Sequence, residues 1–230
     1  MRIRKPMLAA TLIILGGAAL HAQTQPPTLD YSISWIGNTF SGGDAGWVPQ
    51  DVQDIFVAPD GTVYTTVGWE EHRGNIAAFR DGQLVQQTAH WKSGGSDRLV
   101  GQTITANGTH IFYATGTPGG HDGKLTGTFL ARRERADIAS RKFERRVEVG
   151  VRIHGVCASE ERVFAACADG LVRVFDVDLS PLGQWSAPAP GEMALDGRGN
   201  LWVIDSADRV VRRFRRRRRV YQKRALPLET

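Results

Sequence analysis

The 230-residue chain carries 29 Lys and Arg against 24 Asp and Glu, and 41% of its residues are hydrophobic. That length is sufficient for one domain with a substantial core. The basic excess lies at the two ends, because residues 23–211 hold 17 basic and 23 acidic side chains while 212–230 hold nine basic residues and one acid. A mildly acidic body is a poor match for a phosphate backbone, so we expect no nucleic-acid partner.

The first 22 residues have the layout of a secretory signal peptide. A basic start (RIRK, 2–5) precedes 14 apolar or small residues (7–20), and a short polar exit follows. About 20 apolar residues are needed to span a bilayer, so an uncleaved membrane anchor is the weaker alternative. We expect cleavage after Ala22, export to the periplasm or the extracellular space, and no stable membrane insertion after removal of the signal.

From residue 51 onward the chain repeats a strand–turn–strand unit. Four segments align without a gap, at offsets of 48, 52 and 38 residues: DIFVAPDGTVYTT (54–66), QTITANGTHIFYA (102–114), HGVCASEERVFAA (154–166) and EMALDGRGNLWVI (192–204). A second hairpin follows each of them, for example DGLVRVFDVDLSPLGQW (169–185) and DRVVRRFRRRRRVYQKR (208–224). This period is that of one four-stranded propeller blade.

The sequence therefore predicts an all-β protein, a β-propeller of four-stranded antiparallel blades. The predicted blades cover about 51–98, 99–150, 151–187 and 188–226. Residues 23–50 form an N-terminal segment, in which YSISWIGNTF (31–40) is a candidate ring-closing strand.

The last unit, PGEMALDGRGNLWVIDSADRVVRRF (190–214), resembles the NHL repeat, and the first unit resembles the looser form found in gluconolactonase-type (senescence-marker-like) and streptogramin-lyase-like propellers. The resemblance covers roughly residues 51–224. It implies a propeller whose parent fold has six blades, of which four are visible here. We expect a truncated member, with a complete four- or five-bladed protein as the alternative.

The first residue of each aligned block is polar: Asp54, Gln102, His154 and Glu192. The first strand of a blade lies nearest the propeller axis, so these side chains are predicted to surround the channel. Carboxylates and imidazole suit a divalent metal such as calcium or zinc, and the residues are candidates for a ligand or metal site. The alternative is that wet channel positions accept any polar group.

Gluconolactonase-type enzymes hold their metal with Glu, Asn and Asp near blade starts. The residues that precede the aligned blocks here do not match that set: Gln53, Gly101, Ile153 and Gly191. A metal-dependent hydrolase or lyase with its site in the channel is therefore the alternative to a binding or interaction module.

Three loops rich in Trp, His and acidic residues are predicted on one face, and they supply further binding candidates: Trp69, Glu70, His72, Trp91 and His121. Such loops are where propellers hold a small molecule, a glycan or a protein. The alternative is that these side chains only cover blade edges.

Cys157 and Cys167 lie on the two strands of one predicted hairpin. If Ala158 faces Val163, Cys157 faces Phe164 and Cys167 faces His154, so the two sulfurs point to opposite sides of the sheet. We expect two buried free thiols rather than a disulfide.

The arginine run RRFRRRRR (212–219) looks like a nucleic-acid-binding tail, but the repeat places it inside the last blade. Its first three residues align with the third strand of the preceding blade, and Arg215–Arg219 align with the turn to the outer strand. We expect a solvated edge turn, with weak contact to an anionic surface as the alternative.

Overall fold

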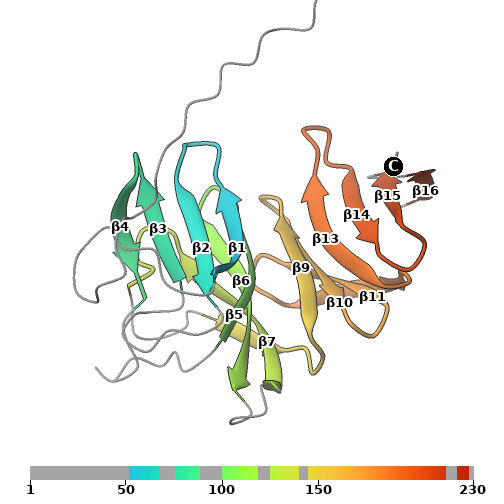
Figure 1. Cartoon of the computed structure of the whole chain (residues 1–230), viewed down its shortest axis with the longest axis horizontal. Coiled ribbons are helices and arrows are strands. Elements are labelled where there is room, and N and C mark those ends of the chain that lie inside the picture. The colour runs from blue at the N-terminus through green and yellow to red at the C-terminus, as the bar shows by residue number, and fades with distance from the viewer. Residues whose placement is uncertain are drawn as a thin grey trace, which may run out of the picture. The chain divides into compact units, whose positions relative to one another are not determined.

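The computed structural model describes residues 52–67, 76–88, 100–118, 125–139, 145–215 and 222–227. These residues form four antiparallel sheets of four strands each (Figure 1). Blade 1 consists of β1 (Val52–Val57), β2 (Val63–Val67), β3 (Ile76–Arg80) and β4 (Gln83–Gln87); blade 2 of β5 (Val100–Ala106), β6 (His110–Pro118), β7 (Leu125–Glu134) and β8 (Arg145–Glu148). Blade 3 consists of β9 (Ile153–Ala158), β10 (Arg162–Cys167), β11 (Leu171–Asp176) and β12 (Pro181–Ser186); blade 4 of β13 (Pro190–Leu195), β14 (Leu201–Asp205), β15 (Val210–Arg215) and β16 (Gln222–Pro227).

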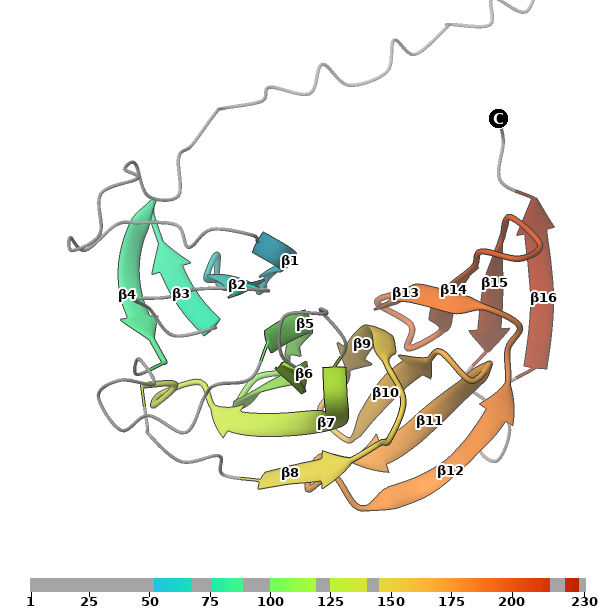
Figure 2. The same ribbon diagram turned by 60° about the horizontal axis from the view of Figure 1, so that its bottom comes forward.

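Within each blade the strands pair in chain order, so the first and the last strand form the two edges. Neighbouring blades contact each other through their first strands, β1 with β5, β5 with β9 and β9 with β13. Figure 2 shows these first strands on the inner side, with β4, β8, β12 and β16 on the outer side. The prediction of an all-β propeller with four-stranded antiparallel blades is confirmed. In the described part of the chain, no helix has the length and apolarity needed to cross a membrane.

The repeat is visible in the strand register. Three blades pair an apolar residue of the second strand with a phenylalanine of the third: Val63 with Phe79, Val163 with Phe175, and Leu201 with Phe214. In blade 2 the equivalent pair is Ile111 with Arg133. Arg133 is 1% exposed, and its Nε donates to the Tyr113 hydroxyl at 2.9 Å. A buried guanidinium thus occupies the position that holds a core phenylalanine elsewhere.

The Gly-containing turns have the backbone geometry that the sequence predicts. Gly61 and Gly199 have φ of 80° and 73°, a left-handed backbone conformation that residues other than glycine rarely adopt. In blade 4, Asp196 organises this turn, since its Oδ1 accepts from the backbone N–H of Asn200 at 2.8 Å and its Oδ2 accepts from Trp202 Nε1 at 3.2 Å. These contacts explain the LDGRGNLW motif as structural.

The core lies between blades, in three apolar clusters. Cys157 belongs to the cluster between blades 3 and 4, while Cys167 belongs to the cluster between blades 2 and 3. Both thiols are free and buried, which confirms the prediction that they lie on opposite sides of one sheet. One expected pair is wrong, because Cys167 pairs with Ile153 rather than with His154. An extra residue in β9 shifts the register there.

Blades 3 and 4 approach closely at a glycine. A Cβ added to Gly155 would lie 2.7 Å from the carbonyl oxygen of Gly191 and 2.9 Å from the Cα of Glu192. Both obstacles belong to the main chain of β13, so they could not rotate away. Gly155 therefore sets the distance between the first strands of the two blades.

The start of the arginine run lies in the sheet as predicted. Arg212, Arg213 and Phe214 belong to β15, and Phe214 is buried. Arg215 ends β15 and pairs with Gln222 at the start of β16. Residues 216–219 lie outside the described residues.

Candidate functional site

A β-bulge interrupts the first strand of every blade, always near the same repeat position. The register shifts by one extra residue between Val52 and Asp54, between Gly101 and Ile104, between Ile153 and Gly155, and between Pro190 and Met193. Bulges of this kind bend a strand and re-aim a side chain. Each predicted channel residue is either inside a bulge or next to one: Asp54, Gln102, His154 and Glu192.

The four predicted residues line two cavities that share one member. Gln102, His154 and Glu192 line a cavity of about 580 Å³. Asp54 and Glu192 line a second cavity of about 560 Å³, whose walls come from β1, β5, β9 and β13. Glu192 therefore belongs to both cavities. We refer to the two together as the channel.

Three further polar residues line the first cavity, and the sequence analysis did not assign them to a site: Gln53, Arg152 and Ser206. Gln53 immediately precedes the aligned block, and Arg152 lies two residues before His154. Alternation of strand residues places Arg152 on the same face as His154, Gln53 lies in the bulge of β1, and Ser206 follows the end of β14. The cavity thus combines two amides, a guanidinium, an imidazole, a carboxyl and a hydroxyl.

Asp54 is held in place by three hydrogen bonds. Its Oδ2 accepts from Thr103 Oγ1 and from the backbone N–H of Ile104, both at 2.8 Å, and its Oδ1 accepts from the backbone N–H of Ile55 at 2.8 Å. Two of these donors belong to blade 2, so Asp54 also connects the first strands of blades 1 and 2.

Glu192 has the opposite electrostatic environment. It makes no hydrogen bond and no ion pair within the described residues. The side chain is exposed to the cavity, yet the surrounding protein removes enough water to raise its pKa, together with the negative charge of Asp54, to about 7. The channel thus holds one fixed carboxylate and one carboxyl that exchanges its proton near neutral pH.

Gln102 and His154 complete the polar wall. Both the Nε2 and the Oε1 atoms of Gln102 are buried without a hydrogen-bond partner in the described structure. Burying an unpaired amide costs free energy, which a ligand with a donor and an acceptor would recover. Burial, with the charge of Arg152, lowers the pKa of His154, so its imidazole is neutral at pH 7.

The metal hypothesis has no matching ligand set among the residues that the structure describes. No three His, Cys, Asp or Glu side chains in those ranges come close enough together to hold a metal ion. Asp54 and His154 line different cavities, and the oxygens of Asp54 already accept three hydrogen bonds. These residues fit a hydrogen-bonding site better than a metal centre.

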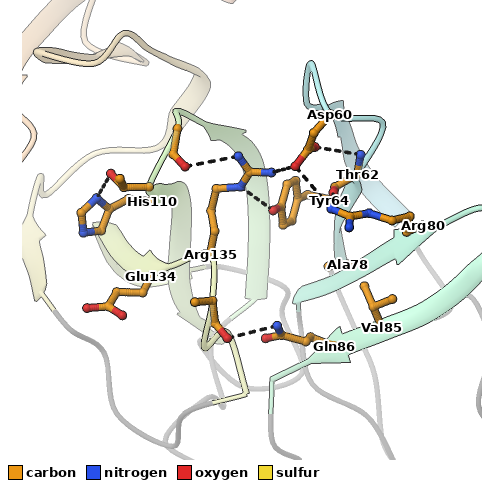
Figure 3. Close-up of a pocket in the computed structure, with 13 residues that line it drawn as sticks. Asp60, Thr62, Tyr64, Ala78, Arg80, Val85, Gln86, His110, Glu134 and Arg135 are labelled. Atoms are coloured by element: carbon orange, nitrogen blue, oxygen red, sulfur yellow. Dashed lines mark hydrogen bonds and ion pairs between the residues drawn. The ribbon is translucent and has the colours of Figure 1, made fainter.

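A third cavity of about 740 Å³ lies between blades 1 and 2 (Figure 3), and it shares Asp60, Gly108 and Arg135 with the 560 Å³ cavity of the channel. Arg135 joins the two blades across it, since its Nη2 contacts Asp60 Oδ2 at 2.6 Å and its Nε donates to the Tyr64 hydroxyl at 2.8 Å. Arg80 contacts the same Asp60 oxygen at 3.3 Å. The sequence analysis did not identify this network, because its partners are far apart in the chain and belong to no motif.

The candidates on the predicted loop face lie outside the described residues: Trp69, Glu70, His72, Trp91 and His121. Their role stays a prediction.

The four sheets and their contacts place the chain in the class of β-propellers. No protein-family model matches its sequence, and no curated protein is similar to it. Solved structures match its fold. They include U3-55K (10% identity over 78% of this chain and 54% of that chain, TM-score 0.56) and streptogramin B lyase (11% identity over 78% and 55%, TM-score 0.51).

A protein of unknown function from Bacteroides caccae also matches, with 12% identity over 76% of this chain and 60% of that chain, at a TM-score of 0.51. At such identities the likeness shows the fold alone. The chain spans little more than half the length of these three structures.

Proposed function

We propose that the protein is an exported binding module whose channel takes a small polar molecule that carries hydroxyl groups and an amine, such as an amino sugar. The unpaired, buried amide of Gln102 in the cavity wall is the observation that carries this proposal. Membership of the NHL-like or gluconolactonase-type propellers is part of the proposal, and it rests on the repeat units alone.

The ligand chemistry follows from the two halves of the channel. Gln53, Gln102 and Ser206 offer donors and acceptors without charge, as hydroxyl groups require. Next to them, Asp54 and Glu192 provide negative charge, and neither forms an ion pair within the described residues. A protonated amine beside these carboxyls would compensate that charge.

Titration calorimetry with three matched sugars tests the proposal. Glucosamine has hydroxyl groups and an ammonium, glucose lacks the amine, and N-acetylglucosamine has a neutral amide in its place. We expect glucosamine to bind more tightly than the other two. Gln102→Ala and Glu192→Gln should each weaken glucosamine binding by about tenfold, the effect of one lost charge-assisted or buried hydrogen bond.

Gln184→Ala is the matched control, because Gln184 is an exposed amide on the outer strand of blade 3. Glucosamine binding should be unaffected by that change. If none of the three sugars binds, or if Gln102→Ala binds as tightly as Gln184→Ala, the channel proposal is wrong.

Export is supported by the signal-like layout of residues 1–22, which lie outside the described residues. Sequencing of the N-terminus of the protein recovered from the periplasm or the medium should give a chain that begins at Gln23. Recovery of a chain that starts at Met1 in the cytoplasm alone would contradict this part of the proposal.

A second candidate function is hydrolysis in the same channel, favoured by two carboxyls with different surroundings. Asp54 accepts three hydrogen bonds, whereas burial and the charge of Asp54 raise the pKa of Glu192 to about 7, and a carboxyl with a raised pKa is typical of acid–base chemistry. Turnover of gluconolactone that Glu192→Gln abolishes would support it. Absence of turnover in the wild-type protein would oppose it.

A further inference from the structure

We infer that the cavity between blades 1 and 2 binds a small zwitterion with an apolar body, such as a short peptide, whose carboxylate contacts Arg80 and whose ammonium contacts Glu134. This site adjoins the channel, because Asp60, Gly108 and Arg135 line both, but Arg80 and Glu134 line this cavity and not the channel. Its volume of about 740 Å³ lies within the range of small-molecule sites, about 300–1,000 Å³.

The charge at the blade 1 end of the cavity is not balanced. Two guanidiniums, those of Arg80 and Arg135, share one oxygen of the Asp60 carboxylate (Figure 3). The other oxygen of Asp60 accepts from the backbone N–H of Thr62 at 3.1 Å, and that hydrogen bond is the largest cause of a pKa lowered to about 2. Asp60 therefore stays ionised, and two positive charges face one negative charge.

Arg80 is the guanidinium that can accept a ligand. Arg135 is committed, because its Nε donates to Tyr64, its Nη1 donates to the carbonyl of Asn107 at 3.3 Å and its Nη2 contacts Asp60. Arg80 uses only Nη2, which contacts Asp60 and donates to Thr62 Oγ1 at 2.7 Å. Its side chain is 53% exposed, and the N–H groups of its Nε and Nη1 have no partner within the described residues, so each can donate a charge-assisted hydrogen bond to a carboxylate oxygen.

Tyr64 holds Arg135 in the same wall. Its hydroxyl oxygen accepts from Arg135 Nε, and Figure 3 shows Tyr64 between Arg135 and Arg80. Tyr64 is only 2% exposed, so we assign it the support of Arg135 and not a contact with the ligand.

The opposite wall carries a negative charge. Glu134 ends β7 of blade 2 and is exposed, and its side chain forms no hydrogen bond or ion pair within the described residues. Ala78 and Val85 add apolar surface to the blade 1 side of the same cavity, and Val85 is 53% exposed. Positive, apolar and negative surface in one cavity match a zwitterion with an apolar side chain rather than a simple anion.

Calorimetric titration of the full chain with L-leucyl-L-leucine tests the inference. We expect binding by the wild-type protein and a loss of about tenfold in affinity in Arg80→Gln, the effect of losing a charge-assisted pair. Glu134→Gln should weaken binding in the same direction. Arg173→Gln is the matched control, because Arg173 forms an ion pair with Asp169 on blade 3, away from the cavity.

Modified ligands locate each contact. Amidation of the peptide carboxylate should weaken binding to the wild-type protein but have little further effect on Arg80→Gln, and N-acetylation should show the same relation to Glu134→Gln. If amidation weakens both proteins equally, the carboxylate does not contact Arg80 and the inference is overturned. It is also overturned if the wild-type protein does not bind the dipeptide.

Two further variants keep the result interpretable. Arg80→Lys retains the charge next to Asp60 but lacks the additional N–H donors of the guanidinium, so it should fold even if Arg80→Gln does not, and it should still bind more weakly than wild type. Glu192→Gln should leave dipeptide binding unchanged. A loss in Glu192→Gln that equals the loss in Arg80→Gln would place the peptide in the channel and overturn the inference.

Discussion

Glu192 and Asp54 line the same cavity, and burial together with the charge of Asp54 raises the pKa of Glu192 to about 7, while three hydrogen bonds hold Asp54 in place. The two carboxyls lie on the first strands of blades 1 and 4, which are far apart in the sequence. Because the pKa of Glu192 is raised to about 7, the net charge of the channel changes near neutral pH.

The first prediction concerns stability against pH. The carboxyl of Glu192 has a usual pKa of 4.5 and titrates near 7 in the folded chain, so between these values the native state binds more protons than the unfolded state. Stability contributed by this group is therefore lost as pH rises through that window. Glu192→Gln should melt at a higher temperature than wild type at about pH 8 and show little difference at about pH 4.

Thermal melts across this pH range provide the measurement. Glu148→Gln, at an exposed position on the outer strand of blade 2, is the control and should show no such trend. A difference between wild type and Glu192→Gln that is constant across the range would contradict the assignment.

The second prediction concerns the approach of blades 3 and 4. Gly155→Ala places a methyl group 2.7 Å from the carbonyl oxygen of Gly191, so the two first strands must separate. We expect a loss of about 1–3 kcal/mol in the free energy of unfolding, measured by urea denaturation. Gly197→Ala has nothing within 4 Å of the new Cβ and should cost less. Equal costs for the two variants would rule out the close approach.

The third prediction concerns a buried ion pair in blade 4. Asp205 and Arg212 are 1% and 6% exposed at their side chains, and their closest atoms lie 2.5 Å apart. Within the described residues, Asp205→Ala leaves the guanidinium with the exposed Asp208 as its one remaining ion-pair partner, so we expect a cost of about 3–5 kcal/mol.

The matched control for that pair is Asp169→Ala, which removes the partner of Arg173 at a more exposed position and should cost less than about 1 kcal/mol. Chemical denaturation of both variants decides between them. A cost for Asp205→Ala as small as the control would show that the buried pair contributes little.

The fourth prediction concerns the two thiols. Burial raises the pKa of both Cys157 and Cys167, so neither forms the reactive thiolate in the native protein. A thiol-reactive dye should label neither cysteine of the folded chain and both after addition of denaturant. Rapid labelling under native conditions would mean that blade 3 opens locally.

Most of the fold could be predicted from the sequence because a blade is a local object. Asp-Gly and Asn-Gly turns fix the hairpins, and the equivalent positions of Val63, Val163 and Leu201 follow from the aligned blocks. The alignment of the repeats also includes blade 2, although Arg133 occupies the place of the phenylalanine there.

The site could be predicted only in part. The alignment identifies Asp54, Gln102, His154 and Glu192 as channel residues, but it cannot divide them between two cavities, because the bulges depend on pairing between strands. The contact of Arg135 with Asp60 is beyond such reasoning as well, since it joins two blades through side chains that repeat nowhere else. The proposed binding role of the predicted loop residues rests on the sequence alone.

The bulges have a consequence for how such a protein can change. An extra main-chain residue sets the direction of each channel side chain, and the hydrogen bonds that hold the sheet do not depend on which side chain it is. Asp54, Gln102, His154 and Glu192 show three chemistries (carboxyl, amide and imidazole) in four copies of one backbone feature. Asp54 also connects blades 1 and 2, but substitution at the other three positions can alter ligand preference with little penalty in folding, so this part of the channel is evolvable and designable.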